Sequence, residues 1–204
     1  MKKIILFGFG GHAISCLDII LENNFEIIGY FDNEKKINSS KFKSIDYLGN
    51  DTQITKFLDK NESSYGLVSF GSHLSLEKRS NLYKTLQQLG INFLPIISSS
   101  SYVSKMSHIE QATIIMHKVV INIGVTVKDN CIINTGTIVD HESIIEKNCI
   151  ISTNVTINGQ VKVGEKTFIG SGAIISNNLN IGSNCIIGAG VTIKKDIPNN
   201  SIIK

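Results

Sequence analysis

The sequence lacks the features of a membrane, secreted or nucleic-acid-binding protein. No stretch reaches the roughly 18 apolar residues of a membrane span, and the apolar start at residues 3–7 is too short for a signal peptide. The 20 Lys and Arg and the 17 Asp and Glu are scattered without a block of like charge, which argues against nucleic-acid binding. We therefore expect a cytoplasmic protein with neither a membrane nor a nucleic-acid partner.

Cysteine is also scarce, and the spacing of the four cysteines does not suit a metal site. Cys131, Cys149 and Cys185 occupy the same position of a repeat described below, so they should stack on one face. Zinc ligands usually include closely spaced pairs such as C-x-x-C, which this chain lacks. We expect reduced, buried thiols and no bound metal.

What the sequence does have is a six-residue repeat through residues 103–198. Read in steps of six from Val103, all sixteen leading residues are Ile or Val. A fixed repeat indicates stacked copies of one structural unit, and a period of six fits neither an α-helix nor a two-sided strand. It fits a parallel β-helix in which three hexads form one triangular coil. The sixteen hexads then make a little more than five coils.

Two further columns of the repeat support this architecture. The fifth residue of most hexads is small or medium-sized, and Leu179 and Ile197 are the large exceptions. The fourth residue is Gly or Asn in nine of the sixteen hexads, and both residue types tolerate positive φ. One left-handed corner in each hexad explains that column. Such a prism buries its Ile and Val column.

The first hundred residues predict a small open sheet of parallel strands. A buried strand at residues 2–7 leads into the turn Gly8-Phe9-Gly10-Gly11-His12-Ala13 and then a helix over residues 13–23. In this context a glycine-rich turn lets the backbone approach a phosphate, and the helix N-terminus offers free N–H groups. A second strand, over residues 26–31, ends at Asp32, where a ribose- or base-binding acid would lie. The alternative is a tight turn that binds no ligand.

The rest of this half alternates between helices and strands. We expect a loop over residues 35–49, a helix over 50–60 capped by Asp51 or Thr52, a strand over 65–71 and a helix over 74–89 closed by Gly90. A fourth strand over 92–97 and a polar hinge over 98–101 complete the pattern. Such a sheet holds a mononucleotide rather than a whole NAD, so a dehydrogenase is disfavoured. The predicted domains are residues 1–101, Rossmann-like, and 102–204, the β-helix.

One histidine of the β-helix has the surroundings of a general base. His141 is the third residue of its hexad and should point outward, with Asp140 before it and Glu142 after it. A carboxylate can orient the ring and stabilise the imidazolium. A surface histidine at a corner fits the same spacing, and spacing alone leaves both readings open.

The chain as a whole resembles one family of hexapeptide acyltransferases. A small domain with Gly-x-Gly-Gly-His, followed by hexads that contain Asn-Thr-Gly and Asp-His-Glu, is similar to the NeuD/PglD-like acetyl-CoA-dependent sugar acetyltransferases of bacteria. The resemblance implies a left-handed β-helix, which general connection rules would not have predicted. It also implies a homotrimer with active sites between neighbouring β-helices.

The resemblance further implies an activity. The family transfers acetyl from acetyl-CoA to the amine of a nucleotide-linked 4-amino-4,6-dideoxy sugar in surface glycan biosynthesis. Attack is direct, with a histidine as general base. Sialic acid O-acetylation and a non-catalytic nucleotide-sugar-binding trimer are the alternatives.

Site residues follow from the same resemblance, position by position. His141 matches the base and Glu142 the acid that orients it. The acceptor site would include Gly10, Gly11, His12, Asp32, Gly71, Ser72 and Asn134. The acetyl-CoA site would include Gly159, whose N–H faces the thioester carbonyl, and Ser171, Gly172, Gly188, Ala189 and Gly190 along the pantetheine arm.

Two departures from the family pattern bear on these assignments. Ile150 stands where a second histidine often follows the base. The usual Gly-x-Pro-Ala-Lys/Arg ending is absent, so we expect either that the sequence is cut short or that CoA is held less tightly. A zinc carbonic anhydrase on the same β-helix needs three converging histidines. His117 and His141 are one coil plus one face apart and would not stack, so such a site would need a histidine from a neighbouring copy.

Overall fold

A computed structural model describes residues 1–35, 45–58 and 64–204, which form two compact units. One unit comprises residues 1–70 and 81–94, and the other comprises residues 71–80 and 95–204. The predicted boundary after residue 101 remains a prediction. The positions of the units relative to each other are not determined, so each is described by itself.

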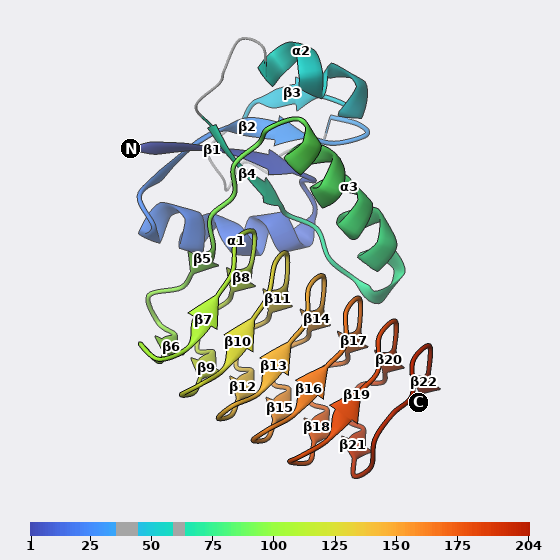
Figure 1. The fold of residues 1–204 in the computed structure, drawn as a ribbon. Helices are drawn as coiled ribbons and strands as arrows, with labels where there is room; N and C mark the ends of the chain where they lie inside the picture. Colours follow the sequence, from blue (N-terminus) through green and yellow to red (C-terminus); the bar gives the residue numbers. More distant parts are fainter. Residues whose placement is uncertain (36–44, 59–63) are drawn as a thin grey trace. The chain divides into compact units, whose positions relative to one another are not determined.

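The first unit is built on a parallel sheet of four strands in the order β3-β2-β1-β4 (Figure 1). β1 (Lys2–Phe7), β2 (Phe25–Phe31), β3 (Tyr47–Gly49) and β4 (Ser64–Val68) supply it. Helix α1 (Gly11–Glu22) buries the apolar stripe that contains Cys16, Ile19 and Ile20. The predicted strands β1, β2 and β4 and helix α1 are confirmed, with small differences at their ends.

Between β2 and β4 the sequence prediction needs correction. Tyr47–Gly49 is strand β3 and not loop, because its backbone pairs with the edge of β2; residues 36–44 lie outside the described part. The 3-10 turn η1 (Asp51–Gln53) and α2 (Ile54–Leu58) follow. Their cap is Asn50 rather than Asp51 or Thr52: Asn50 Oδ1 accepts from Thr52 N at 3.1 Å, and Gln53 Oε1 accepts from Asn50 N. Residues 59 and 60 of the predicted helix also lie outside the described part.

The segment that leads into the β-helix is also corrected. After η2 (His73–Ser75) and α3 (Leu76–Gln88), Asn92 makes only a single bridge to Tyr65. The predicted fourth strand instead contributes β5 (Ile96–Ile97) to the β-helix, where it pairs with Ile114 and Ile115. The hexad register therefore starts at Ile97, one hexad earlier than the sequence prediction. Residues 98–101 are the first turn of the β-helix rather than a hinge.

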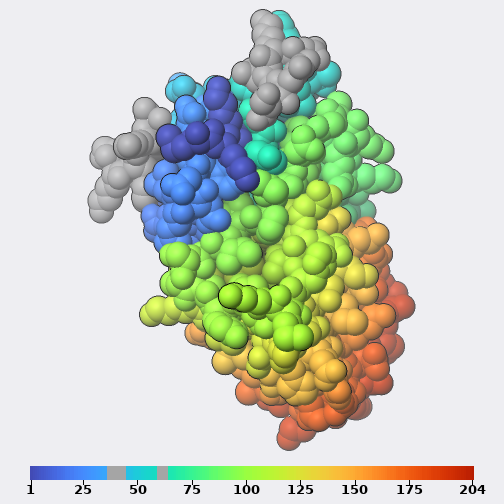
Figure 2. Space-filling model, turned by 60° about the vertical axis from the view of Figure 1, so that its left-hand side comes forward, coloured from blue at the N-terminus to red at the C-terminus, as the bar shows by residue number. Residues whose placement is uncertain are grey.

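The second unit is the predicted β-helix, with short strands that pair in register with the strands one coil before and one coil after them. Its seven-stranded face runs β5, β8 (Ile114–Ile115), β11 (Ile132–Ile133), β14 (Ile150–Ile151), β17 (Phe168–Ile169), β20 (Ile186–Ile187), β22 (Ile202–Ile203). The six-stranded face runs β6 (Tyr102–Val103), β9 (Val120–Ile121), β12 (Ile138–Val139), β15 (Thr156–Ile157), β18 (Ile174–Ile175), β21 (Thr192–Ile193). The five-stranded face runs β7 (His108–Ile109), β10 (Thr126–Val127), β13 (Ile144–Ile145), β16 (Lys162–Val163), β19 (Asn180–Ile181). Figures 1 and 2 show the coils in sequence from yellow-green to red.

Three corners join these faces. We call the turns between the six- and five-stranded faces the His141 corner (residues 104–107, 122–125, 140–143, 158–161 and 176–179). The Asn134 corner joins the seven- and six-stranded faces (residues 98–101, 116–119, 134–137, 152–155, 170–173 and 188–191). The third corner joins the five- and seven-stranded faces. The two named corners therefore border the six-stranded face on opposite sides.

The left-handed column is confirmed and extends beyond Gly and Asn. All fourth residues of the hexads from Ala112 to Gly190 have φ between 54° and 73°. Lys118, Glu142 and Gln160 adopt this conformation although side chains disfavour it. The N–H of such a corner residue bonds a carbonyl in the corresponding turn of the preceding coil, as from Glu142 to Ile123 at 3.0 Å, which holds the turn.

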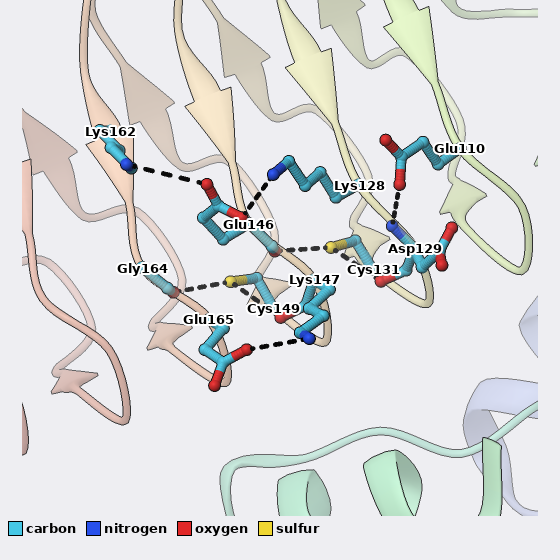
Figure 3. Close-up of polar contacts among 10 residues, drawn as sticks. All are labelled: Glu110, Lys128, Asp129, Cys131, Glu146, Lys147, Cys149, Lys162, Gly164 and Glu165. Atoms are coloured by element: carbon cyan, nitrogen blue, oxygen red, sulfur yellow. Dashed lines mark hydrogen bonds and ion pairs between the residues drawn. The ribbon is translucent and has the colours of Figure 1, made fainter. Parts of the chain in front are cut away.

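The fifth column is fully buried at Cys131, Cys149 and Cys185, as predicted, and all four cysteines are free. Cys131 Sγ donates to Glu146 O and Cys149 Sγ to Gly164 O, each at 3.1 Å (Figure 3). Thr137 and Ser143 use their hydroxyls in the same way toward a carbonyl of the following coil. Burial raises the pKa of Cys149 well above its ordinary value, so this thiol is a poor nucleophile.

Neighbouring residues of β13 allow a matched test of the core. Ile145 is fully buried, whereas Ile144 points outward. We expect Ile145→Ala to lower the free energy of unfolding by about 2–5 kcal/mol because it leaves a cavity. Ile144→Ala should cost much less. Urea unfolding of the two variants measures the difference, and equal costs would contradict the inward column.

Candidate active site

The side chains of His141 and Glu142 lie against each other on the His141 corner. Nδ1 of His141 lies 3.4 Å from Oε2 of Glu142, and both side chains are about half exposed. Gln160 Nε2 donates to the same Glu142 oxygen at 3.0 Å. Glu142 thus holds the Nδ1 side of the ring, which leaves Nε2 as the nitrogen that can act on a substrate.

Asp140 stabilises the turn rather than the ring. Its Oδ1 accepts the backbone N–H of His141 at 2.8 Å and the side-chain amide of Asn122 at 2.8 Å. The hydrogen bond from the His141 backbone N–H, helped by that from Asn122, lowers the pKa of Asp140. Of the two carboxylates beside His141, Glu142 is therefore the one that orients the imidazole.

Gly159 lies one coil beyond His141, directly against its ring. A Cβ at Gly159 would collide with Nε2 and Cε1 of His141. Gly159 is itself buried, although its hexad position lies on the corner. The lack of a side chain at this position makes room for the ring and places Nε2 beside the backbone of the next coil.

The N–H of Gly159 differs from its equivalents in the neighbouring turns. In the two preceding turns of this corner, the equivalent N–H groups belong to Ile123 and His141. The Ile123 N–H donates to the side chain of Asn122, and the His141 N–H donates to the side chain of Asp140. Asn158 instead turns its amide to Ile175 O at 2.7 Å. Within the described residues, the Gly159 N–H has no hydrogen-bond acceptor. A donor in this state next to Nε2 has the properties of an oxyanion-hole group.

The other predicted β-helix residues lie along the Asn134 corner. Asn134 uses its Oδ1 to accept from Thr135 N at 2.8 Å. Ser171 Oγ lies 2.9 Å from Ser152 Oγ and accepts from Thr153 Oγ1 at 2.9 Å. A strip of small residues completes this part of the corner: Gly172, Gly188, Ala189 and Gly190. One chain does not bring this strip to His141, because the two corners border opposite sides of the six-stranded face.

In the first unit, the structure brings Asp32 to the glycine-rich turn. Its Oδ2 accepts from Phe9 N at 2.9 Å and its Oδ1 from Asn33 N at 2.7 Å. A Cβ at Gly10 or Gly11 would meet nothing within 4 Å, so this turn is open. His12 follows in α1, with Nε2 3.7 Å from Cys16 Sγ. These predicted residues share one sheet edge.

Gly71 and Ser72 belong to the second unit. A Cβ at Gly71 would collide with the side chain of Ile132. The backbone N–H of Ser72 donates to Ser75 Oγ at 2.8 Å in the cap of η2. The contacts of both residues therefore serve packing and capping.

Sequence reasoning missed the residues that support the corner. Gln160 lies one coil after Glu142, and Asn122 lies one coil before Asp140. The coil length of three hexads, which the repeat predicts, would have been enough to predict both pairs. The different orientation of the Asn158 amide has no signal in the sequence.

Comparison with known proteins shows where the chain belongs. The PglD N-terminal domain family matches residues 3–86, the bacterial transferase hexapeptide (six repeats) matches 160–195, and the hexapeptide repeat of succinyl-transferase matches 118–141. The chain therefore combines a PglD-type N-terminal domain with hexapeptide repeats. The predicted family resemblance is thereby confirmed. No curated protein matches it.

Solved structures similar to this PglD-like chain cover nearly all of it. PerB from Caulobacter crescentus, in complex with CoA and GDP-perosamine, is 25% identical with a TM-score of 0.89 over 99% of this chain and 93% of that one. The acetyltransferase domain of PglB from Neisseria gonorrhoeae FA1090, in complex with acetyl coenzyme A, is 26% identical with a TM-score of 0.87 over 98% and 95%. WeeI from Acinetobacter baumannii AYE, at 16% identity and a TM-score of 0.76 over 100% and 97%, shows the fold alone. The predicted fold class is confirmed.

The described residues contain neither a membrane-spanning helix nor a cluster of metal ligands. Within residues 1–35, 45–58 and 64–204, no helix is long and apolar enough to span a membrane. Over the same ranges, no three His, Cys, Asp or Glu side chains are grouped as metal ligands.

The contact between Gly159 and His141 leads to a prediction. Gly159→Ala should displace the imidazole, and we expect it to lower the free energy of unfolding by about 1–3 kcal/mol through overpacking. In a His141→Ala background the same substitution should cost much less, because the ring is gone. Urea unfolding of the four proteins measures the coupling, and an equal cost in both backgrounds would show that ring and glycine do not touch.

Proposed function

We propose that this protein is an acetyl-CoA-dependent N-acetyltransferase that acts on the amine of a nucleotide-linked 4-amino-4,6-dideoxy sugar. The observation that carries the proposal is the close approach of His141 Nε2 to Gly159 on the next coil, whose N–H has no acceptor among the described residues. A base and an oxyanion donor side by side are the two groups that acetyl transfer to an amine requires.

The reaction that suits this pair is direct transfer. The neutral amine attacks the thioester carbonyl while Nε2 of His141 takes the proton that the nitrogen loses. Glu142 stabilises the imidazolium through Nδ1. The Gly159 N–H donates to the carbonyl oxygen as negative charge develops there. The C–S bond then breaks, and the proton from His141 neutralises the CoA thiolate.

The donor would lie along the small residues of the Asn134 corner. Ser171, Gly172 and residues 188–190 leave a narrow arm such as pantetheine close to the backbone, and the exposed Ser171 hydroxyl suits its amides. The PerB structure holds CoA and the PglB acetyltransferase domain holds acetyl coenzyme A, which supports the same donor here.

The acceptor would use the edge of the first unit. The open turn at Gly10 and Gly11 and the N-terminus of α1 suit a diphosphate, and Asp32 adjoins them. GDP-perosamine in the PerB complex supports a nucleotide-linked amino sugar as the acceptor class. We propose a place in bacterial glycan biosynthesis on the same ground.

A complete site requires more than one copy of the chain. The six-stranded face carries apolar side chains that are strongly exposed, Tyr102 at 61% and both Ile138 and Ile174 at 42%. The five-stranded face carries the ion pairs of Glu146 with Lys128 and Lys162 and suits water (Figure 3). If a threefold ring turns its six-stranded faces inward, the Asn134 corner of each copy meets the His141 corner of the next. We propose this homotrimer.

Turnover of acetyl-CoA tests the function. Thiol release should be observed with one of a panel of UDP-, dTDP- and GDP-linked 4-amino sugars, and His141→Gln should reduce kcat by about 100-fold or more. The matched control is His108→Gln, at an exposed histidine of the five-stranded face, which should remain active.

Other outcomes of this assay would count against the proposal. Turnover with free sialic acid alone would indicate O-acetylation. Lack of acetyl-CoA binding would contradict an acetyltransferase. Normal turnover of His141→Gln would remove His141 as the base.

A further inference from the structure

A second histidine of the β-helix, His117, lies on the Asn134 corner and is held in a network of serine hydroxyls. The mechanism proposed above does not use this network. His117 Nδ1 lies 2.7 Å from Ser98 Oγ and 3.5 Å from Ser100 Oγ, and the two hydroxyls lie 3.0 Å apart. Ser98 is fully buried, whereas His117 is partly exposed. The backbone helps to fix the network, since Lys118 N donates to Ser100 Oγ at 3.2 Å and Ser100 N to Ser98 Oγ at 3.3 Å.

This arrangement orients the ring and leaves one nitrogen for a ligand. The Ser98 contact fits either tautomer of the ring. In the tautomer whose Nδ1 accepts from the Ser98 hydroxyl, the proton lies on Nε2, which then offers a hydrogen-bond donor. Among the residues the structure describes, Nε2 of His117 has no hydrogen-bond partner. A turn at the protein surface does not need a buried serine to fix the orientation of a partly exposed histidine, so this arrangement suggests a role in binding.

The register of the coils places this nitrogen on the acceptor side of the proposed site. His117 lies one coil before Thr135, next to Asn134, so the two turns are adjacent on one corner. Adjacent coils lie about 4.8 Å apart. The residues proposed for CoA begin at Ser171, two coils beyond Asn134 in the opposite direction. The family resemblance implies that Asn134 lies beside the acceptor amine, so His117 would flank that amine from the side away from the donor.

We propose that His117 is a positioning residue for the acceptor, which it holds through a hydrogen bond from Nε2 to an acceptor oxygen about one coil from the amine. This inference rests on the proposed function. Two kinds of oxygen on a nucleotide sugar lie at about that distance from a 4-amino group: a ring hydroxyl and the phosphate at the anomeric carbon. Ser98 acts through His117 by fixing its ring.

Steady-state kinetics test the proposal, with the panel sugar that gives the highest turnover as the probe. His117→Ala should raise the KM for the nucleotide sugar about tenfold or more, from the loss of one hydrogen bond. The KM for acetyl-CoA should stay within about twofold, since the donor binds on the other side. His117→Gln, which keeps a side-chain N–H, should recover most of the loss. Ser98→Ala should show a smaller increase of the same kind.

Inhibition by the free nucleoside diphosphate identifies the oxygen. If the partner is the phosphate, His117→Ala weakens this inhibition in step with the KM; if it is a ring hydroxyl, inhibition is unchanged while the KM still rises. A KM for the sugar equal to that of wild type in His117→Ala would overturn the proposal. Parallel changes in both KM values and in the melting temperature, without rescue by Gln, would assign His117 a structural role instead.

The outcome can be separated from failure of the proposed function. An active wild type with a normal His117→Ala variant refutes only the role of His117. If no sugar supports turnover, calorimetric binding of GDP-perosamine to wild type and His117→Ala still decides whether His117 holds a nucleotide sugar. His108→Ala, at the exposed histidine of the five-stranded face, is the control and should leave both KM values unchanged.

Discussion

The hydrogen-bonded register between coils is the constraint on which the β-helix depends. Each strand pairs with the equivalent strands of the adjacent coils, and each corner N–H bonds a carbonyl in the preceding coil. These bonds keep residues such as Glu142 in a left-handed conformation that their side chains disfavour. Because no coil inserts or omits a residue between Ile97 and Ile193, a side chain at one turn meets the same partner position on the next coil.

The proposed chemistry uses this register directly. His141 meets Gly159, Glu142 meets Gln160 and Asp140 meets Asn122, each one coil apart. Three such contacts between coils give a turn held by Asp140, a ring oriented by Glu142 and a backbone N–H beside Nε2. The scaffold positions these groups without a loop insertion, and its rigidity keeps them in place before substrate binds.

Much of the β-helix and of its site was predictable from the sequence, because few folds are compatible with a six-residue repeat. The Ile and Val column predicts which residues are buried, and the Gly and Asn column predicts the corners even where Lys118 or Gln160 occupies one. Single-sequence reasoning failed where pairing decided the outcome: Ile96–Ile97 could join either sheet, and Tyr47–Gly49 is a strand only because β2 offers an edge. Side-chain choices such as the Asn158 amide are decided by contacts between coils and leave no pattern in the sequence.

Complementation between two inactive variants tests the shared site most directly. His141→Ala disables the His141 corner, and Ser171→Trp obstructs the exposed Asn134 corner, so each alone should be inactive. In randomly mixed threefold rings of equal proportions, about one site in four pairs an intact corner of each kind. We therefore predict recovery of about a quarter of the wild-type activity on co-expression. No recovery, in trimers shown to contain both variants, would contradict a site built from two copies.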